Sequence, residues 1–157
     1  MPNVRAAVGR RIPSFSLPAT GGKTWKPAMA AGKKLVLYFY PKDNTAGCTK
    51  EGEAFRDLHG AFVKAGAVVL GVSPDSVASH EKFKAKMSFP FDLLADEQRT
   101  VCALFDVIRE KSMYGRKFTG VERSTFLFDA KGVLQREWRK VKVAGHAEEV
   151  LAAVRAL

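Results

Sequence analysis

Cys48 stands where a thiol can serve as a nucleophile. It follows Gly47 at the end of a polar stretch that begins at Lys42, just before positions with helical spacing. The first N–H groups of a helix have no partner within the helix and carry partial positive charge, which favours an anion beside them. Because the thiolate is the reactive form of cysteine, this location predicts an activated thiol. A cysteine that only packs would more naturally lie in an apolar stripe than in a polar loop.

A buried strand and a helix must hold this thiol in place. The apolar run 35–40 ends at Pro41, which is typical of a central strand buried on both faces. The next apolar positions have the spacing of one face of a helix that Gly66 ends: Ala54, Phe55, Leu58, Phe62 and Val63. With Thr45 as the N-cap, Cys48 is the third helical residue and meets backbone donors. The Thr45 hydroxyl can then cap the helix and also face a bound substrate.

The remaining periodicity predicts an α/β fold with a mixed sheet covered by helices on both faces. The further strands, of which the last two form a hairpin, are expected at 67–72, 91–95, 124–128 and 133–138. Helices are expected over 77–87, along a stripe with i, i+3, i+4, i+7 spacing, and from about Ala147; the stripe is Val101, Leu104, Phe105 and Ile108. Chemistry in such sheets gathers beyond the carboxyl ends of the strands, where the 41–48 loop lies.

The composition is that of an ordinary globular chain, expected to form one domain over residues 1–157. Of its residues, 46% are hydrophobic and 27% are charged, which suits one packed core without disulfides or structural metal. The formal net charge is +10, but basic residues are interleaved with apolar and acidic ones, which favours a solvated surface over a nucleic-acid site. Residues 1–5 lack the apolar stretch of a secretory signal, and no later segment has the length of a membrane span, so a cytoplasmic protein is expected.

The segment 38–51 closely resembles the active-site segment of the peroxiredoxins, in particular the bacterioferritin comigratory protein or peroxiredoxin Q group. The P-x-x-x-T-x-x-C pattern of that family is present as Pro41, Thr45 and Cys48. Further motifs in the same order extend the similarity over nearly the whole chain: 9–15, 71–75, 123–126 and 145–151. Several separated motifs in one order are far more specific than one short pattern.

The resemblance implies a thioredoxin-like fold and a peroxidase that uses no metal or organic cofactor. It implies that Cys48 attacks hydrogen peroxide or an alkyl hydroperoxide and becomes a sulfenic acid. Thr45 and Arg123 would bind and polarise the peroxide, and Pro41 would keep water off the sulfur. Arg123 cannot lose its proton, so it would also hold the thiolate anionic. Thioredoxin is the implied reductant, with glutathione and glutaredoxin as the alternative, and a monomer or weak homodimer is expected.

Glu51 has two interpretations. Three residues after Cys48, it can share a helix face with the thiol and take part in catalysis. Its charge can equally well do no more than favour the first turns of the helix. The sequence leaves both open.

Cys102 departs from the pattern of the relatives that use an internal resolving thiol. In those relatives the second cysteine often lies five positions after the first or in the following helix, and here Glu53 and residues 83–85 hold those places. Cys102 is expected to be a half-buried helix residue beside the apolar stripe. A disulfide requires the two Cα atoms to come within about 7 Å, which calls for local unfolding. A one-cysteine cycle with an external thiol is therefore favoured over a disulfide between Cys48 and Cys102.

Three other classes of function fit the sequence less well than a peroxidase does. A cysteine hydrolase needs a histidine base, but His59, His80 and His146 are expected at helix surfaces or caps, and their spacing suggests no metal site. A thiol–disulfide oxidoreductase commonly uses C-x-x-C, and the two cysteines here are 54 positions apart. A basic binding module has no specific motif, since the 21–24 segment lacks the first glycine of a phosphate loop and reads as a turn.

Overall fold

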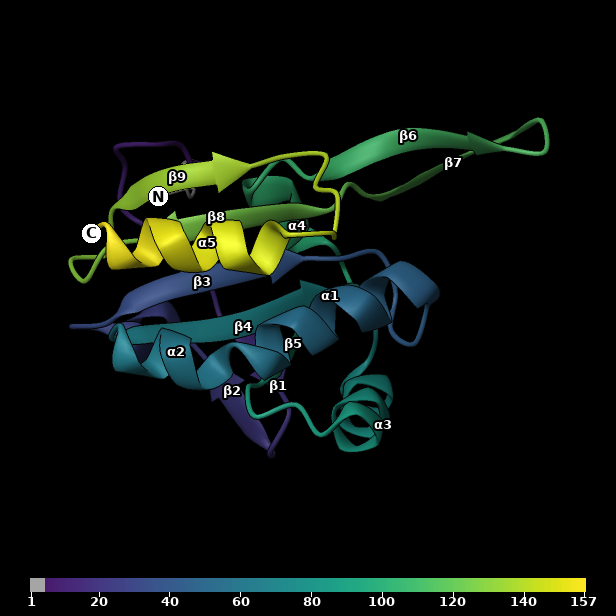
Figure 1. Ribbon diagram of the computed structural model, residues 1–157. Helices are drawn as coiled ribbons and strands as arrows, with labels where there is room; N and C mark the ends of the chain where they lie inside the picture. The colour runs from purple at the N-terminus through teal and green to yellow at the C-terminus, as the bar shows by residue number, and fades with distance from the viewer. Residues whose placement is uncertain (1–4) are drawn as a thin grey trace.

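A seven-stranded mixed sheet forms the centre of the computed structural model, which describes residues 5–157 (Figure 1). Its order is β2-β1-β5-β4-β3-β8-β9. Strands β3, β4 and β5 are parallel, and the other neighbours pair antiparallel. The bounds are β1 Leu17–Ala19, β2 Lys23–Trp25, β3 Lys34–Phe39, β4 Ala67–Ser73, β5 Leu93–Ala95, β8 Ser124–Phe128 and β9 Leu134–Trp138. The predicted mixed sheet is confirmed. Residues 1–4, which were part of the segment examined for a secretory signal, lie outside the described residues.

Helices cover both faces of the sheet, as predicted. They are the 3-10 helix η1 Pro27–Ala30 and the α-helices α1 Ala46–Asp57, α2 His59–Lys64, α3 Val77–Met87, α4 Thr100–Leu104 and α5 His146–Arg155. Helices α1, α2 and α5 lie across one face (Figure 1) and share a buried cluster with Val36 and Tyr38 of β3. Helix α4 packs on the other face, in the cluster that contains Leu35, Leu37 and Phe39. Alternate residues of β3 therefore enter different layers, as side chains of a strand must.

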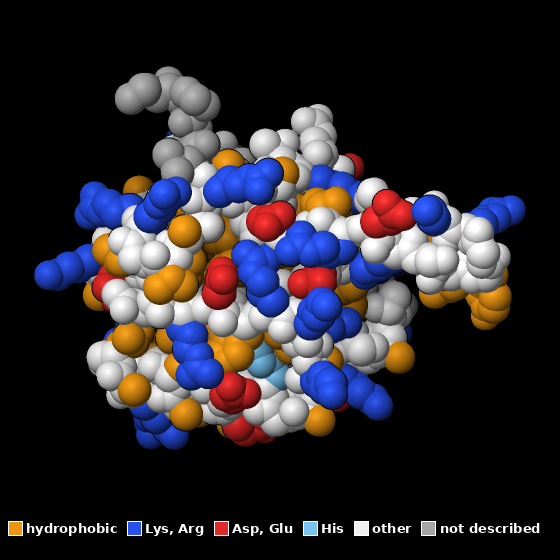
Figure 2. Space-filling model, turned by 90° about the horizontal axis from the view of Figure 1, so that it is seen from above, with side chains coloured by type: hydrophobic (Ala, Val, Ile, Leu, Met, Phe, Trp, Pro, Cys, Tyr) orange, Lys and Arg blue, Asp and Glu red, His pale blue; other side chains and the backbone are white. Residues whose placement is uncertain are grey.

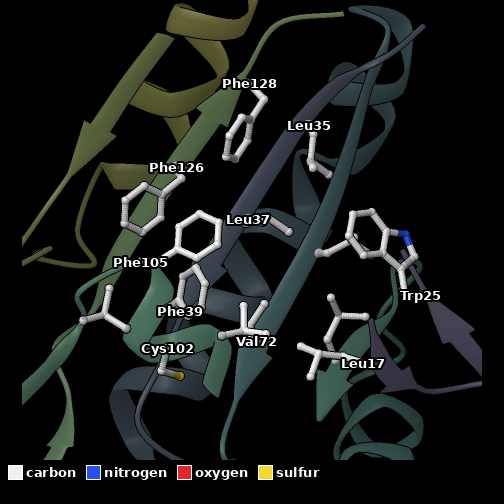
Figure 3. Packing of buried hydrophobic residues seen from close by; sticks show 14 of the residues in the cluster. Leu17, Trp25, Leu35, Leu37, Phe39, Val72, Cys102, Phe105, Phe126 and Phe128 are labelled. Atoms are coloured by element: carbon white, nitrogen blue, oxygen red, sulfur yellow. The ribbon is translucent and has the colours of Figure 1, made fainter. Parts of the chain in front are cut away.

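Aromatic rings fill the layer under α4. The ring of Phe105 lies 4.9 Å from that of Phe39 and 4.8 Å from that of Phe126, centroid to centroid. Figure 3 shows this group with Cys102 beside Phe39 and Val72, on the same side of the sheet. Ring pairs at such separations stabilise a core beyond the area that they bury.

The helix predicted to run without interruption to Gly66 is broken. Helix α1 ends at Asp57, Leu58 has φ −99° and ψ 1°, and α2 begins at His59. Gly60 follows directly, and a glycine weakens helical continuation because it costs the most backbone entropy. Phe62 packs inward, but Val63 is exposed, so its predicted place on the apolar face is wrong.

The prediction of a helix that reaches Ile108 is also wrong. Helix α4 ends at Leu104, and Asp106 takes the left-handed conformation with φ 53°. The Val107 N–H bonds the Cys102 carbonyl at 3.1 Å, which closes the helix end in the manner of a Schellman motif. Ile108 opens a separate hairpin that the sequence did not predict, formed by β6 Ile108–Met113 and β7 Arg116–Val121. This hairpin extends away from the body of the molecule (Figure 1).

Gly21 and Gly22, with φ of 83° and 70°, make the turn between β1 and β2, as predicted for the 21–24 segment. Across residues 5–157, the helices are all too short or too polar to cross a bilayer.

Candidate active site

The strand-to-helix connection after β3 places Cys48 at the start of α1. The chain leaves the sheet at Phe39, and α1 begins at Ala46 with Thr45 as its extended N-cap residue. Cys48 is therefore the third helical residue, beyond the carboxyl end of a central strand, as the sequence predicted. Its side chain belongs to the cluster under α1 and is only 1% exposed. The sulfur thus lies in a low-dielectric setting at a helix N-terminus.

A buried polar network holds the loop that leads to Cys48. The Asp43 carboxylate accepts a hydrogen bond from the Tyr40 hydroxyl at 2.6 Å and from the Ser79 hydroxyl at 2.7 Å, and it lies 2.7 Å from Nδ1 of His80. The Asp43 N–H donates to the Asp75 carboxylate at 2.8 Å. The backbone and side chain of Asp43 are therefore tied to Tyr40, to α3 and to the β4–α3 connection, which restricts where α1 can start.

His80 is completely buried, so the prediction of a surface or cap position is wrong for it. Its Nε2 lies 2.9 Å from the Leu94 carbonyl oxygen, which can only accept a hydrogen bond, so Nε2 carries a proton. Its Nδ1 faces Asp43, and one proton must lie between the two groups for that contact to be a hydrogen bond. The sequence feature that could have predicted this burial is the helical spacing of His80, Phe83 and Met87, which places the histidine on the buried face of α3.

The same network has the spacing of a cation site, which the sequence did not suggest. One ligand atom each from Asp43, Asp75 and His80 lies within 4.8 Å of the others. The two carboxylates already accept hydrogen bonds from protein groups, and Asp75 also accepts one from the Ser73 hydroxyl at 2.6 Å. Carboxylates whose oxygens already accept hydrogen bonds from protein groups describe an internal hydrogen-bond network rather than a metal centre.

Arg123 contacts Cys48, although the two residues are 75 positions apart in the sequence. It follows β7 and precedes β8, and its Nη2 lies 3.4 Å from the Cys48 sulfur. Its Nη1 donates to Oε1 of Glu51 at 2.7 Å. A Cβ on Gly47 would lie 3.0 Å from Nη2, so the small residue before the cysteine lets the guanidinium approach. One planar cation thus contacts the thiol and the carboxylate at once.

Glu51 is buried beside this cation, with 1% of its side chain exposed. Its second oxygen, Oε2, has no hydrogen-bond partner among the described residues. Burial raises the pKa of Glu51 to about 7, although the neighbouring Arg123 acts to lower it. The carboxyl therefore changes its charge near neutral pH within contact of the guanidinium that faces Cys48.

Thr45 and Pro41 lie in the loop that leads into α1. Thr45 is the N-cap residue, but its hydroxyl donates to the Lys42 carbonyl at 2.8 Å and makes no cap hydrogen bond, so the predicted capping by this hydroxyl is wrong. Its side chain is exposed, and Pro41 is half-buried. The structure joins Cys48 and Glu51 through Arg123, and Pro41 and Thr45 lie in the connection that precedes α1.

Cys102 lies on the other side of the sheet from Cys48. It is completely buried in the aromatic layer under α4, so the expected half-burial is wrong. Its N–H donates to the Asp96 carboxylate at 2.7 Å. Burial and the nearby Asp96 charge raise the pKa of the Cys102 thiol far above its ordinary value. Its surroundings therefore oppose thiolate formation.

Fold and site together define a class of protein: a thioredoxin-like α/β domain with an Arg-paired cysteine in the first turn of a helix. The profile of the AhpC/TSA family matches residues 8–137. A Xanthomonas campestris protein named peroxiredoxin Bcp is 53% identical over 91% of both chains, and a Coxiella burnetii protein named putative peroxiredoxin bcp is 49% identical over 92% of this chain and 95% of its own. A solved structure of Xanthomonas campestris peroxiredoxin Q covers 90% of both chains with a TM-score of 0.86 and 53% identity.

The chain belongs to the AhpC/TSA family and, within it, to the peroxiredoxin Q or Bcp group. The family suggested by residues 38–51 is thereby confirmed, as is the thioredoxin-like fold.

Proposed function

We propose that this protein is a thiol-dependent peroxidase that reduces hydrogen peroxide and organic hydroperoxides through Cys48. The observation that carries the proposal is the position of the sulfur at a helix N-terminus with the Arg123 guanidinium 3.4 Å away. Support comes from the Xanthomonas campestris bacterioferritin comigratory protein, 52% identical to this chain, whose alkyl peroxide reduction activity was studied in trapped-intermediate and ligand complexes.

In the proposed reaction, the Cys48 thiolate donates an electron pair to one peroxide oxygen. The S–O bond forms as the O–O bond breaks, the attacked oxygen becomes the sulfenic hydroxyl, and the other oxygen leaves with the bonding electrons. That oxygen takes up a proton and departs as water or an alcohol. Arg123 and the free N–H groups of α1 face the region where negative charge moves, so they stabilise the transition state without reorganising.

The remaining site residues act around this step. We assign to Thr45 the binding of the peroxide, because its exposed side chain belongs to the N-cap residue of α1, three positions before Cys48. Pro41 borders the loop and limits access of water to the sulfur. For Glu51 we favour a positioning role over a purely helical one, because its buried Oε1 bonds Arg123 at 2.7 Å and fixes the guanidinium against the thiol.

The sulfenic acid is then reduced by an external thiol in a one-cysteine cycle. This part of the proposal is supported by the place of Cys102, whose side chain packs in the layer on the far side of the sheet. A disulfide with Cys48 would demand Cα atoms within about 7 Å and therefore large local unfolding. Thioredoxin, or glutathione with glutaredoxin, is the proposed reductant, and the cytoplasm, where such thiols stay reduced, is the proposed location.

Intact-mass measurement after one equivalent of hydrogen peroxide tests this function. We expect an adduct of one oxygen on Cys48, and a mixed disulfide on Cys48 when a small trapping thiol is present. An internal disulfide between Cys48 and Cys102 would overturn the one-cysteine cycle and leave the peroxidase intact. No modification of Cys48 would contradict the peroxidase itself.

A further inference from the structure

The β6–β7 hairpin is largely exposed to solvent. It extends from the body in Figure 1, and Figure 2 shows hydrophobic side chains gathered along one side of it, with basic side chains extending from its end. Tyr114 and Gly115 form its turn with φ of 52° and 76°, and Tyr114 is 98% exposed. A bulky residue rarely takes positive φ, because this conformation strains its backbone. The exposed Tyr114 ring has little packing that could offset the strain. The tip of the hairpin thus presents an aromatic ring to solvent.

The register of the hairpin divides its side chains between two unlike faces. Cross-strand partners in a two-stranded sheet share a face, and alternate residues along each strand point to opposite faces. One face, called the cationic face below, combines three basic and two large apolar side chains without an acid: Arg109, Lys111, Met113, Arg116 and Phe118.

The opposite face has the features of a solvated surface. It pairs Glu110 with Thr119 and Ser112 with Lys117. The Lys117 ammonium lies 3.6 Å from the Glu110 carboxylate, so the charges on this face largely cancel. The net positive charge and the exposed large apolar side chains of the two strands therefore lie on the cationic face.

The cationic face begins at the active site. Strand β7 leads through Glu122 directly to Arg123, the residue that contacts Cys48. Lys111 donates to the Val121 carbonyl at 2.7 Å. Burial and Arg123 lower the pKa of Lys111, whereas Cys48 acts to raise it, so this face lies within electrostatic reach of the reacting thiol.

Hydrogen bonds and ion pairs hold the base of the hairpin to neighbouring residues, so the hairpin has a defined position. The Arg99 guanidinium donates to the Thr119 carbonyl at 3.2 Å and to its hydroxyl at 3.0 Å. Arg109 makes ion pairs with Asp106 at 3.2 Å and with Glu122 at 3.7 Å. Beyond this base, Met113, Arg116 and Phe118 have exposed side chains.

We propose that the cationic face of the β6–β7 hairpin is the docking surface for a protein dithiol with an acidic surface, which reduces the sulfenic acid at Cys48. The proposal rests on the peroxidase function and specifies its reductant. An acidic partner is favoured because two cations of the face, Lys111 and Arg116, make no ion pair among residues 5–157, and because the whole chain has a formal net charge of +10. A second copy of this chain would carry the same +10 charge, which opposes pairing through this face.

The reduction that this surface serves has two steps. One partner thiol attacks the sulfenic sulfur, which forms a mixed disulfide and releases the sulfenic oxygen as water. The second partner thiol then attacks the partner's sulfur in that disulfide, which leaves a disulfide in the partner and restores the Cys48 thiol. The partner loses two electrons and Cys48 gains two.

Two adjacent charge reversals give a matched test. Arg116→Glu lies on the cationic face and Lys117→Glu on the opposite face, and both side chains are exposed. Oxidation of Cys48 by hydrogen peroxide is measured first, without reductant, and turnover is then measured with thioredoxin and separately with dithiothreitol. We expect Arg116→Glu to raise the KM for thioredoxin about fivefold or more and Lys117→Glu to change it less than twofold. Peroxide oxidation and dithiothreitol turnover should match those of the unaltered chain in both variants.

The apolar part of the face has its own test, because Phe118→Ser should also raise the KM for thioredoxin. Equal effects of Arg116→Glu and Lys117→Glu, or no effect of either, would overturn the docking surface. A dimer of the unaltered chain in sedimentation that Arg116→Glu dissociates, with an unchanged KM, would assign the face to a second copy instead. Failure of peroxide oxidation before any reductant is added would reject the peroxidase function itself.

Discussion

Cys48 and Cys102 are two buried thiols on opposite faces of one sheet. Their exposures are 1% and 0%, so accessibility to solvent does not distinguish them. Their electrostatic surroundings do: Cys48 lies at a helix N-terminus with the Arg123 guanidinium 3.4 Å away, whereas Cys102 lies in an aromatic layer beside the Asp96 carboxylate. Burial in an apolar setting opposes a charge unless a partner of opposite sign accompanies it.

The comparison shows that the two thiols differ in the sign of the neighbouring charge rather than in burial. Low dielectric strengthens the attraction between Cys48 and Arg123, and it equally strengthens the repulsion between Asp96 and a thiolate at Cys102. The same physical condition therefore strengthens an attraction on one face of the sheet and a repulsion on the other.

Loss of the Cys48 sulfur should give the largest effect. Cys48→Ser should lower the peroxide reduction rate by at least about 10⁴-fold, because serine lacks a comparable nucleophile. The matched variant Cys102→Ser should keep peroxide reduction within about threefold of the unaltered rate. Stopped-flow peroxide consumption with dithiothreitol measures both. Comparable losses of the peroxide reduction rate in the two variants would contradict the proposed difference between Cys48 and Cys102.

Removal of the cation beside Cys48 should give the next largest effect. Arg123→Gln should lower the second-order rate with peroxide by about 10²–10³-fold, because a charged donor aimed at the moving charge is lost. The rate of Arg123→Lys should fall between that of the unaltered chain and that of Arg123→Gln, since one ammonium does not replace a guanidinium that contacts Cys48 and Glu51 together. Arg136→Gln, at an exposed arginine that pairs with Glu149, is the control and should be neutral. A rate for Arg123→Gln that equals this control would contradict the role of the cation.

The pH dependence of stability should report on Glu51. Folding raises the pKa of this carboxyl from 4.5 to about 7, so the folded state binds the proton more tightly than the unfolded state does. The corresponding contribution to stability is fully present below pH 4.5 and is lost as pH rises through 7, by about 3 kcal/mol at most. Glu51→Gln should remove this decline in urea unfolding measured between these pH values. The same decline in the Gln variant would assign it to another group.

The smallest effect should come from Cys102→Ala. Removal of one buried sulfur should lower the free energy of unfolding by about 1 kcal/mol while peroxide turnover stays unchanged. In the unaltered chain, an alkylating reagent should modify Cys102 only after unfolding, because its burial and Asp96 raise its thiol pKa. Alkylation of Cys102 in the folded chain at a rate near that of free cysteine would show that the two thiols are more alike than their surroundings indicate.

Local sequence determined the elements that begin the active site. The apolar run 35–40, the polar loop after Pro41 and the place of Cys48 at a helix start were all predictable, because strand burial and helix initiation depend on a few consecutive residues. The late hairpin and the helix over 77–87 were predictable for the same reason. The family resemblance then pointed to Arg123 as the distant partner of the thiol.

Other features were decided only by tertiary structure. Ile108 completes a helical spacing with Phe105, yet it begins a strand because Asp106 ends the helix in a left-handed conformation. His80 was expected at a surface, but the network around Asp43 supplies a buried partner that periodicity does not reveal.

The separation of the two cysteines is also a tertiary result. Pairing of β3 with β4 and β8 places Cys48 and Cys102 in different layers, and the contact of Cys48 with Arg123 joins residues 75 positions apart. Periodicity reports which residues are buried, but it does not report the face or the charge beside which they are buried. Those depend on which distant segments pair, and for this protein they place Cys48 beside Arg123 and Cys102 beside Asp96.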